Sequence, residues 1–72
     1  MNNLIKLKEW YYDTHAHGNL TKPLLINVNE ISSITETTNN RDFEGTTIIM
    51  NNGVQHLVKE IFDEVCKMID NN

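Results

Sequence analysis

An Asn-Gly pair in the second half of the chain constrains the fold more than any other feature. Asn52-Gly53 lies between two runs, Thr46–Met50 and Val54–Val58, that are rich in β-branched and apolar residues. Such a pair adopts the positive φ angles of the tight turn that joins two antiparallel strands. After residue 60 the apolar residues recur at helical spacing, and these are Ile61, Val65, Met68 and Ile69. The sequence therefore predicts a hairpin followed by a helix over about residues 60–70, which must pack on a sheet to be stable.

Three further strands are predicted in the first half of the chain. The first is Leu4–Tyr12, whose aromatic end suits a pleated surface. The second and third are Leu24–Val28 and Ile31–Glu36, separated by a tight turn or bulge at Asn29-Glu30. Pro23 cannot donate a ladder hydrogen bond, so it restricts the second strand to a sheet edge or makes it a strand start.

The polar segment Asp13–Lys22 is predicted to be a hairpin loop or a hairpin tip, and Thr37–Gly45 is predicted to be a loop. Residues 1–72 then form a single α+β domain, a small twisted antiparallel β-meander of four to five strands with one C-terminal helix packed on it. The predicted core consists of Ile5, Leu7, Leu25, Val28, Ile31, Ile34, Ile48, Met50, Leu57, Ile61, Val65 and Ile69.

The chain is short, with 72 residues and a single cysteine, Cys66. A domain of this length buries only about 60% of the surface of its unfolded chain, so its stability is marginal. One thiol cannot form an internal disulfide, and Cys66 lies on the apolar stripe of the helix, as a buried structural thiol does. We therefore expect additional support from self-association, as a homodimer or a higher oligomer.

The net charge of −4 argues against a partner that is a long phosphate backbone, so duplex DNA is excluded. A small anionic ligand held by a few local donors is compatible with it. The longest apolar run is Leu24–Ile26, which predicts neither a membrane span nor a signal peptide. A lone cysteine also suits a reducing compartment, so the expected location is the cytoplasm of a bacterium or of a phage-infected bacterial cell.

Asp13, His15 and His17 alternate, so an extended backbone would place all three on one face. Two imidazoles and a carboxylate could hold zinc with a water in the fourth position. The alternative is a solvated loop that contains two histidines. We favour the solvated loop because no further ligand is near in sequence, and we expect no metal and no cofactor.

Aromatic and basic residues gather at the two predicted loops. Aromatic faces can stack a nucleobase, and cationic side chains can bind a phosphate. The candidate ligand-binding residues are Trp10, Tyr11, Tyr12, His15, His17, Lys22 and Arg41. The alternative for Trp10 and one tyrosine is packing against the helix or a neighbouring subunit.

No constellation of catalytic residues is evident. The sequence contains no Ser-His-Asp arrangement, no Gly-rich phosphate loop and no Cys-x-x-Cys motif. Asp63 and Glu64 lie where the dipole of the predicted helix favours acidic side chains, so they do not indicate an acid–base pair. We conclude that the chain is not an enzyme.

Several segments carry a family resemblance. Ile26–Glu36, Thr47–Gly53, Val58–Glu60 and Asp63–Val65 are similar to the strand, Asn-Gly turn, Val-Lys-Glu and helix motifs of the FlbD/SwrD-like flagellar and swarming motility family of small bacterial proteins. The match is strongest over residues 26–69, and the chain is also similar to short phage-encoded proteins. The chain departs from the family in a longer Tyr11–Lys22 segment and in an inserted stretch at Asn39–Gly45. The resemblance implies the fold given above and a protein–protein adaptor.

Two functions from different classes follow. The first is a small, phage-encoded, homo-oligomeric binding module that sequesters an anionic or nucleotide-like ligand at or near a subunit interface. The alternative is a protein–protein adaptor related to the motility proteins. We prefer the first because the departures from the family fall in predicted loops, where binding residues tend to lie.

Overall fold

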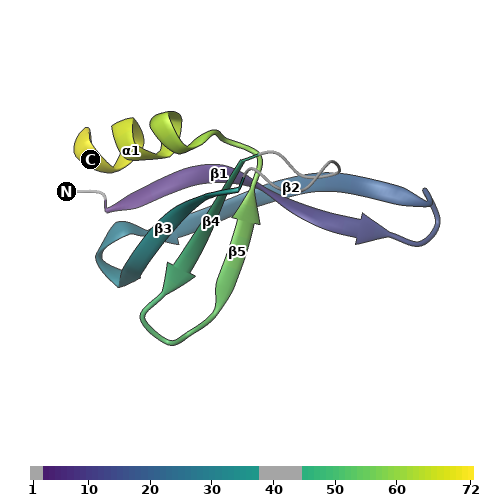
Figure 1. Ribbon diagram of the computed structural model, residues 1–72, viewed down its shortest axis with the longest axis horizontal. Coiled ribbons are helices and arrows are strands. Elements are labelled where there is room, and N and C mark those ends of the chain that lie inside the picture. The colour runs from purple at the N-terminus through teal and green to yellow at the C-terminus, as the bar shows by residue number, and fades with distance from the viewer. Residues whose placement is uncertain (1–2, 38–44) are drawn as a thin grey trace.

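The computed structural model describes residues 3–37 and 45–72, and these form a five-stranded antiparallel sheet with one helix at its C-terminal end (Figure 1). The α+β architecture predicted from the sequence is thereby confirmed. The elements are β1 (Leu4–Asp13), β2 (Gly18–Asn27), the 3-10 turn η1 (Val28–Glu30), β3 (Ile31–Thr37), β4 (Gly45–Met50), β5 (Gln55–Val58) and α1 (Phe62–Asp70).

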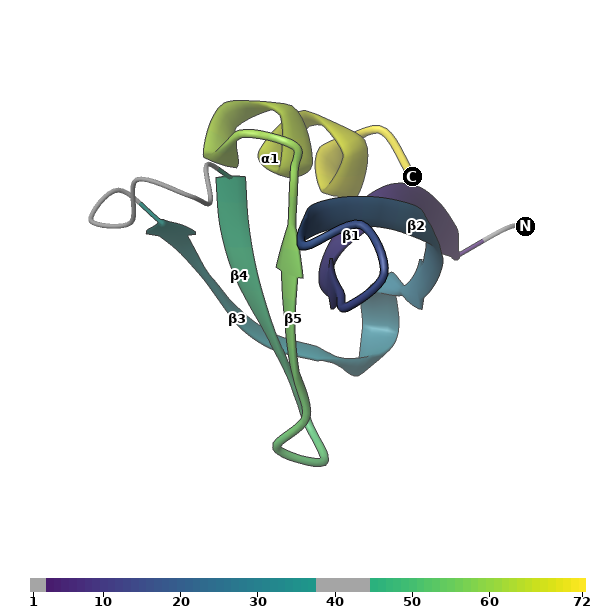
Figure 2. The ribbon, with the colours of Figure 1, turned by 90° about the vertical axis from the view of Figure 1, so that its right-hand side faces the viewer.

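The strand order is β2-β1-β5-β4-β3, so chain order and sheet order differ at one point. A simple meander would pair β2 with β3, but in the structure β1 pairs with β5 at Glu9 and Val58. The turn η1 instead carries the chain from one edge strand to the other. Figure 2 shows the result, with the β1–β2 hairpin on one side, β3, β4 and β5 on the other, and α1 across one end.

The core lies between these two parts of the sheet, under the helix. Its buried apolar residues are Ile5, Leu7, Ile26, Ile48, Val58 and Val65. Burial of such side chains contributes about 1.5–3 kcal/mol each to the free energy of unfolding. Val28, Ile31, Ile34, Met50 and Ile69 pack against this cluster as predicted, but only partly buried.

Two residues predicted for the core, Leu25 and Ile61, are exposed at 62% and 51%. The register of β1 and β2 explains the first error. Ile26 lies opposite Ile5, so Ile26 faces the core and its neighbour Leu25 must face the other way. Ile61 precedes the helix and lies at its N-cap.

The segment Asp13–Lys22 contains the predicted hairpin tip, but it is mostly strand and not a long loop. Only residues 14–17 form the turn, and β2 starts at Gly18 and pairs with β1 without interruption. Because β5 pairs with β1 only at Glu9, residues 10–22 project beyond the sheet as a two-stranded arm (Figure 1). The arm contributes to the long dimension of the molecule, 39 Å against 22 Å in the other two directions.

The predicted edge position of Pro23 is confirmed, because β2 is the last strand on its side of the sheet. The β4–β5 hairpin is also confirmed. Gly53 has a φ of 89°, and the Asn52 side chain accepts a hydrogen bond from the N–H of Val54. Together these residues close the turn that the Asn-Gly pair predicts.

The helix begins at Phe62, two residues later than the helical spacing suggests. Residues 59 and 60 continue along β1 instead, because the N–H of Lys59 donates to the carbonyl of Lys8 and the N–H of Lys8 donates to Oε1 of Glu60. The hydroxyl of the fully buried Thr46 donates to the Glu60 carbonyl, at 2.9 Å. Three separate contacts thus anchor the connection between the sheet and the helix.

Candidate functional site

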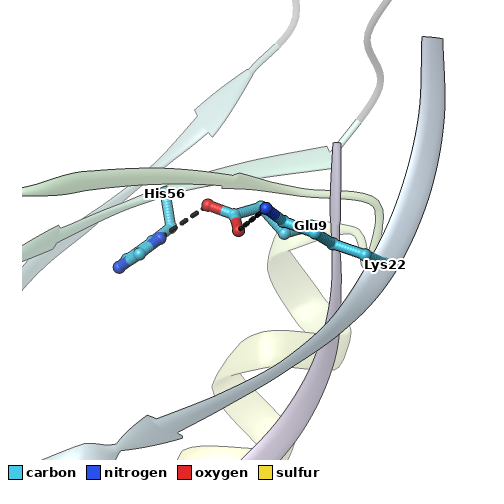
Figure 3. Close-up of polar contacts among 3 residues, drawn as sticks. All are labelled: Glu9, Lys22 and His56. Atoms are coloured by element: carbon cyan, nitrogen blue, oxygen red, sulfur yellow. Dashed lines mark hydrogen bonds and ion pairs between the residues drawn. The ribbon is translucent and has the colours of Figure 1, made fainter. Parts of the chain in front are cut away.

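The Glu9 carboxylate, which contacts both a histidine and a lysine, lies where the arm leaves the sheet. Glu9 Oε2 is 2.6 Å from Nδ1 of His56, and Glu9 Oε1 is 3.9 Å from Nζ of Lys22 (Figure 3). The three side chains come from β1, β5 and β2, and Glu9 and His56 are largely buried at 18% and 22% exposure. The short contact with His56 links β1 to β5 at the point where their pairing ends.

A groove lined by lysines runs over β1 and β2. Its volume is about 400 Å³, and we call it the lysine groove; its lining residues are Lys6, Leu7, Lys8, Thr21, Lys22, Pro23 and Glu60. Three of the five lysines in the chain line this one groove. Glu60 is the one carboxylate among its described lining residues, and its Oε1 already accepts the backbone N–H of Lys8. The groove therefore concentrates positive charge on a molecule whose net charge is negative.

A second groove, of about 390 Å³, lies beside the β4–β5 turn and the η1 turn. Its lining residues are Asn27, Glu30, Met50, Asn51, Asn52, Val54 and His56. Asn27 and Asn52 use their side-chain oxygens to accept local backbone N–H groups, as turn residues do. Glu9 touches a lining residue of each groove, Lys22 in the first and His56 in the second.

The aromatic residues proposed as ligand contacts lie along the arm, and their faces are already in contact with lysines. Nζ of Lys22 is 5.5 Å from the ring centre of Tyr11, and Nζ of Lys59 is 5.9 Å from the ring centre of Trp10. Each is a cation–π contact. Trp10 lies directly opposite Thr21, a lining residue of the lysine groove, whereas Tyr12 is exposed at 61%. Trp10 thus lies on the same face of the hairpin as Lys8 and Thr21 of the groove, whereas the side chains of Tyr11 and Lys22 lie on the opposite face.

His15 and His17 lie in the turn at the tip of the arm, exposed to solvent. Asp13 does not form a ligand set with them. Its Oδ1 accepts the backbone N–H groups of His15 and Ala16, and His17 takes a positive φ of 53°. These are the contacts of a tight turn. Within residues 3–37 and 45–72, no three His, Cys, Asp or Glu side chains are arranged to hold a metal ion.

Arg41, the remaining candidate, lies outside the described residues. In the part of the chain that the structure covers, no helix combines the length and the apolar character needed to cross a membrane.

Sequence reasoning missed Lys6, Lys8 and the Glu9–His56 pair. The alternation of Lys6 and Lys8 on one face of the first strand was visible in the sequence and could have indicated a basic stripe. No local signal links Glu9 to His56, which are 47 residues apart. Their contact depends on the pairing of β1 with β5, which a sequential meander does not contain.

Comparison of the chain with protein-family models, with curated proteins and with solved structures gave no match. The resemblance to the FlbD/SwrD-like family therefore stays a prediction.

Proposed function

We propose that this chain is a small non-catalytic binding module that self-associates and holds an anionic, nucleotide-like ligand in the lysine groove. The site differs from the one expected from the sequence, since it is built on paired strands and not on loops. Lys22 belongs both to the residues expected from the sequence and to the lining of the lysine groove.

The observation that carries the proposal is the grouping of Lys6, Lys8 and Lys22 around one groove of an acidic chain. The ammonium groups of Lys6 and Lys8, on one face of β1, can donate to several oxygens of one phosphate or carboxylate ligand, whereas Lys22, the partner of Glu9, projects from the other face. Trp10, opposite Thr21 at the arm end of the groove, offers an aromatic ring beside that anion site. A nucleotide combines both features, an anion and a planar base.

The first experiment is isothermal titration of the untagged protein with ATP, a cyclic dinucleotide and inorganic phosphate. We expect heat from at least one nucleotide, and an affinity that falls when NaCl is raised from about 50 to 500 mM, since salt screens contacts with exposed lysines. The absence of heat from all three probes would refute the proposal.

A charge-removing variant tests the location of the site. Lys6→Gln combined with Lys8→Gln should weaken binding by about tenfold or more, because each change removes a charge-assisted donor. Lys67→Gln removes one positive charge, against two in the double variant, from the last turn of α1, outside the groove, and should leave the affinity unchanged. Equal losses in both variants would show that net charge, and not the groove, determines binding.

A protein–protein adaptor is the second candidate, and the exposed apolar residues of the arm favour it. Tyr12 and Leu20 are exposed at 61% and 40% on a two-stranded arm that stands clear of the sheet. A pull-down from a flagellated bacterium with the wild-type protein and with Tyr12→Ser distinguishes the two functions. A motor or secretion component retained only by the wild type would support the adaptor.

A further inference from the structure

The two edges of the sheet differ in how well they are protected against strand addition. β2 forms one edge and carries Pro23. Backbone groups of Lys8 bond to residues 59 and 60, on the β5 side, so the backbone of its partner Pro23 faces the outside. Proline has no N–H to offer there, and this interrupts the row of donors that an incoming strand requires.

The β3 edge has no such protection. Ile31–Thr37 contains no proline and no lysine, and its single charged residue is Glu36. The only irregularity is a bulge between Ile31 and Ser33, which leaves Ser33–Thr37 in regular register with β4. In the described part of the chain, no strand pairs with the outer side of β3 (Figure 2).

The register shows which backbone groups lie on that outer side. Met50 bonds to Val54, so the backbone groups of Met50 and Ile48 face β5, and those of Thr47 face β3. Thr35 is the register partner of Thr47 and therefore bonds inward, to β4. Its neighbours Ile34 and Glu36 present their N–H and C=O groups outward.

We propose that a second copy of this chain pairs its β3 antiparallel to this edge, with the two-fold axis at Thr35. Ile34 then lies opposite the partner's Glu36 on each side of the axis, and the two pairs form about four backbone hydrogen bonds. Ser33 lies opposite the partner's Thr37, so hydroxyl groups meet across the axis, as they already do between Thr37 and Thr47 within one chain, at 2.8 Å.

The charges also suit this register, because neither Glu36 faces another carboxylate. The inference rests on the self-association in the proposed function but not on the ligand. The lysine groove lies on β1 and β2, at the opposite end of the strand order. Assembly and ligand binding can therefore be tested separately.

Cysteine cross-linking tests the axis directly. In a Cys66→Ala background, Thr35→Cys should form a covalent dimer on mild oxidation, because directly opposed residues of a non-hydrogen-bonded pair have Cα atoms about 4.5 Å apart. Ser33→Cys is the matched control. Its own copy would lie about 13 Å away along the paired strands, too far for a disulfide. Equal cross-linking of both variants, or none in Thr35→Cys, would overturn the proposal.

A proline variant tests the backbone pairing. Glu36→Pro removes an outward N–H and no bond to β4, so native mass spectrometry should show a dimer for the wild type and a monomer for the variant. Leu25→Pro places the same change on the outer edge of β2 and should remain dimeric. A monomeric wild type, or a dimeric Glu36→Pro, would overturn the proposal. Titration of Glu36→Pro with the nucleotide panel reports separately on the ligand, since a monomer that still binds would leave the groove proposal intact.

Discussion

At the residue scale, Gly45 occupies a position that no other residue can take. Its φ is 145°, and a Cβ built there would lie 1.8 Å from the carbonyl oxygen of Val58. The absence of a side chain allows β4 to start beside the fully buried Val58, where Thr46 also reaches the Glu60 carbonyl. This position connects the sheet to the segment that leads into the helix.

Gly45→Ala should therefore lower the free energy of unfolding by more than about 3 kcal/mol, because either the strand or residue 58 must move. Gly53→Ala is the control. Its φ of 89° is also unfavourable for alanine, but a Cβ there meets nothing within 4 Å, so about 1–2 kcal/mol is expected. Urea unfolding followed by circular dichroism measures both. Similar losses in the two variants would show that conformational strain, and not the close approach to Val58, makes glycine necessary.

The sequence predicted residues with local roles but not those with distant partners. Pro23 and the Asn52-Gly53 pair were placed correctly, since edge and turn positions follow from the residue's own backbone chemistry. Gly45 was assigned to a loop, and His56 was not among the predicted site residues. The partners of these two residues, Val58 and Glu9, are determined by strand pairing, which no local pattern encodes.

At the scale of elements, α1 begins without a side-chain cap. Ile61 is in the N-cap position with extended backbone angles, and its side chain cannot accept the unpaired N–H groups of the first turn. The negative charges of Asp63 and Glu64 in that turn interact favourably with the positive end of the helix dipole. The apolar period extends through Ile61 although the helix does not, which is why the sequence placed this residue in the core.

Ile61→Ser should be more stable than Ile61→Ala by about 1 kcal/mol, because both remove the same half-exposed side chain and only serine supplies a cap. Thermal unfolding of the two variants side by side provides the comparison. Equal stability would mean that the first-turn N–H groups are satisfied by water as well as by a hydroxyl.

Strand pairing also explains why residues 13–22, predicted to be a hairpin loop or a hairpin tip, are mostly strand. The segment is polar and contains Gly18 and Asn19, which are typical of turns, yet both lie in strand β2. Pairing with the aromatic segment of β1 overrides this composition, since Tyr11 lies opposite Leu20 and Tyr12 lies opposite Asn19. Cross-strand contacts, and not local propensity, extend the hairpin.

At the scale of the whole molecule, the arm and the core are separate structures. The core residues of β1 and β2 precede Lys8 or follow Pro23, whereas the arm beyond Glu9 has no third strand. A two-stranded hairpin is marginally stable in water, so the arm adds little to the stability of the sheet.

Shortening the arm tests this separation. Replacing residues 12–19 with Asn-Gly would join Tyr11 directly to its partner Leu20 through a two-residue turn. We expect a change of less than about 1 kcal/mol in the free energy of unfolding, and the nucleotide binding proposed for the lysine groove should be unaffected. A large loss of stability in urea unfolding would contradict this prediction and show that the arm supports the fold.

In the proposed assembly, the position of Pro23 limits how many copies of this chain can join. A sheet with two receptive edges can propagate without end, as in the filaments of cross-β aggregates. If β3 pairs with a second copy as proposed, the edges left open are the two β2 strands, and each lacks an N–H donor at Pro23, so growth by strand addition should stop at two copies. In the proposed dimer a single imino acid would thus limit the assembly to two copies.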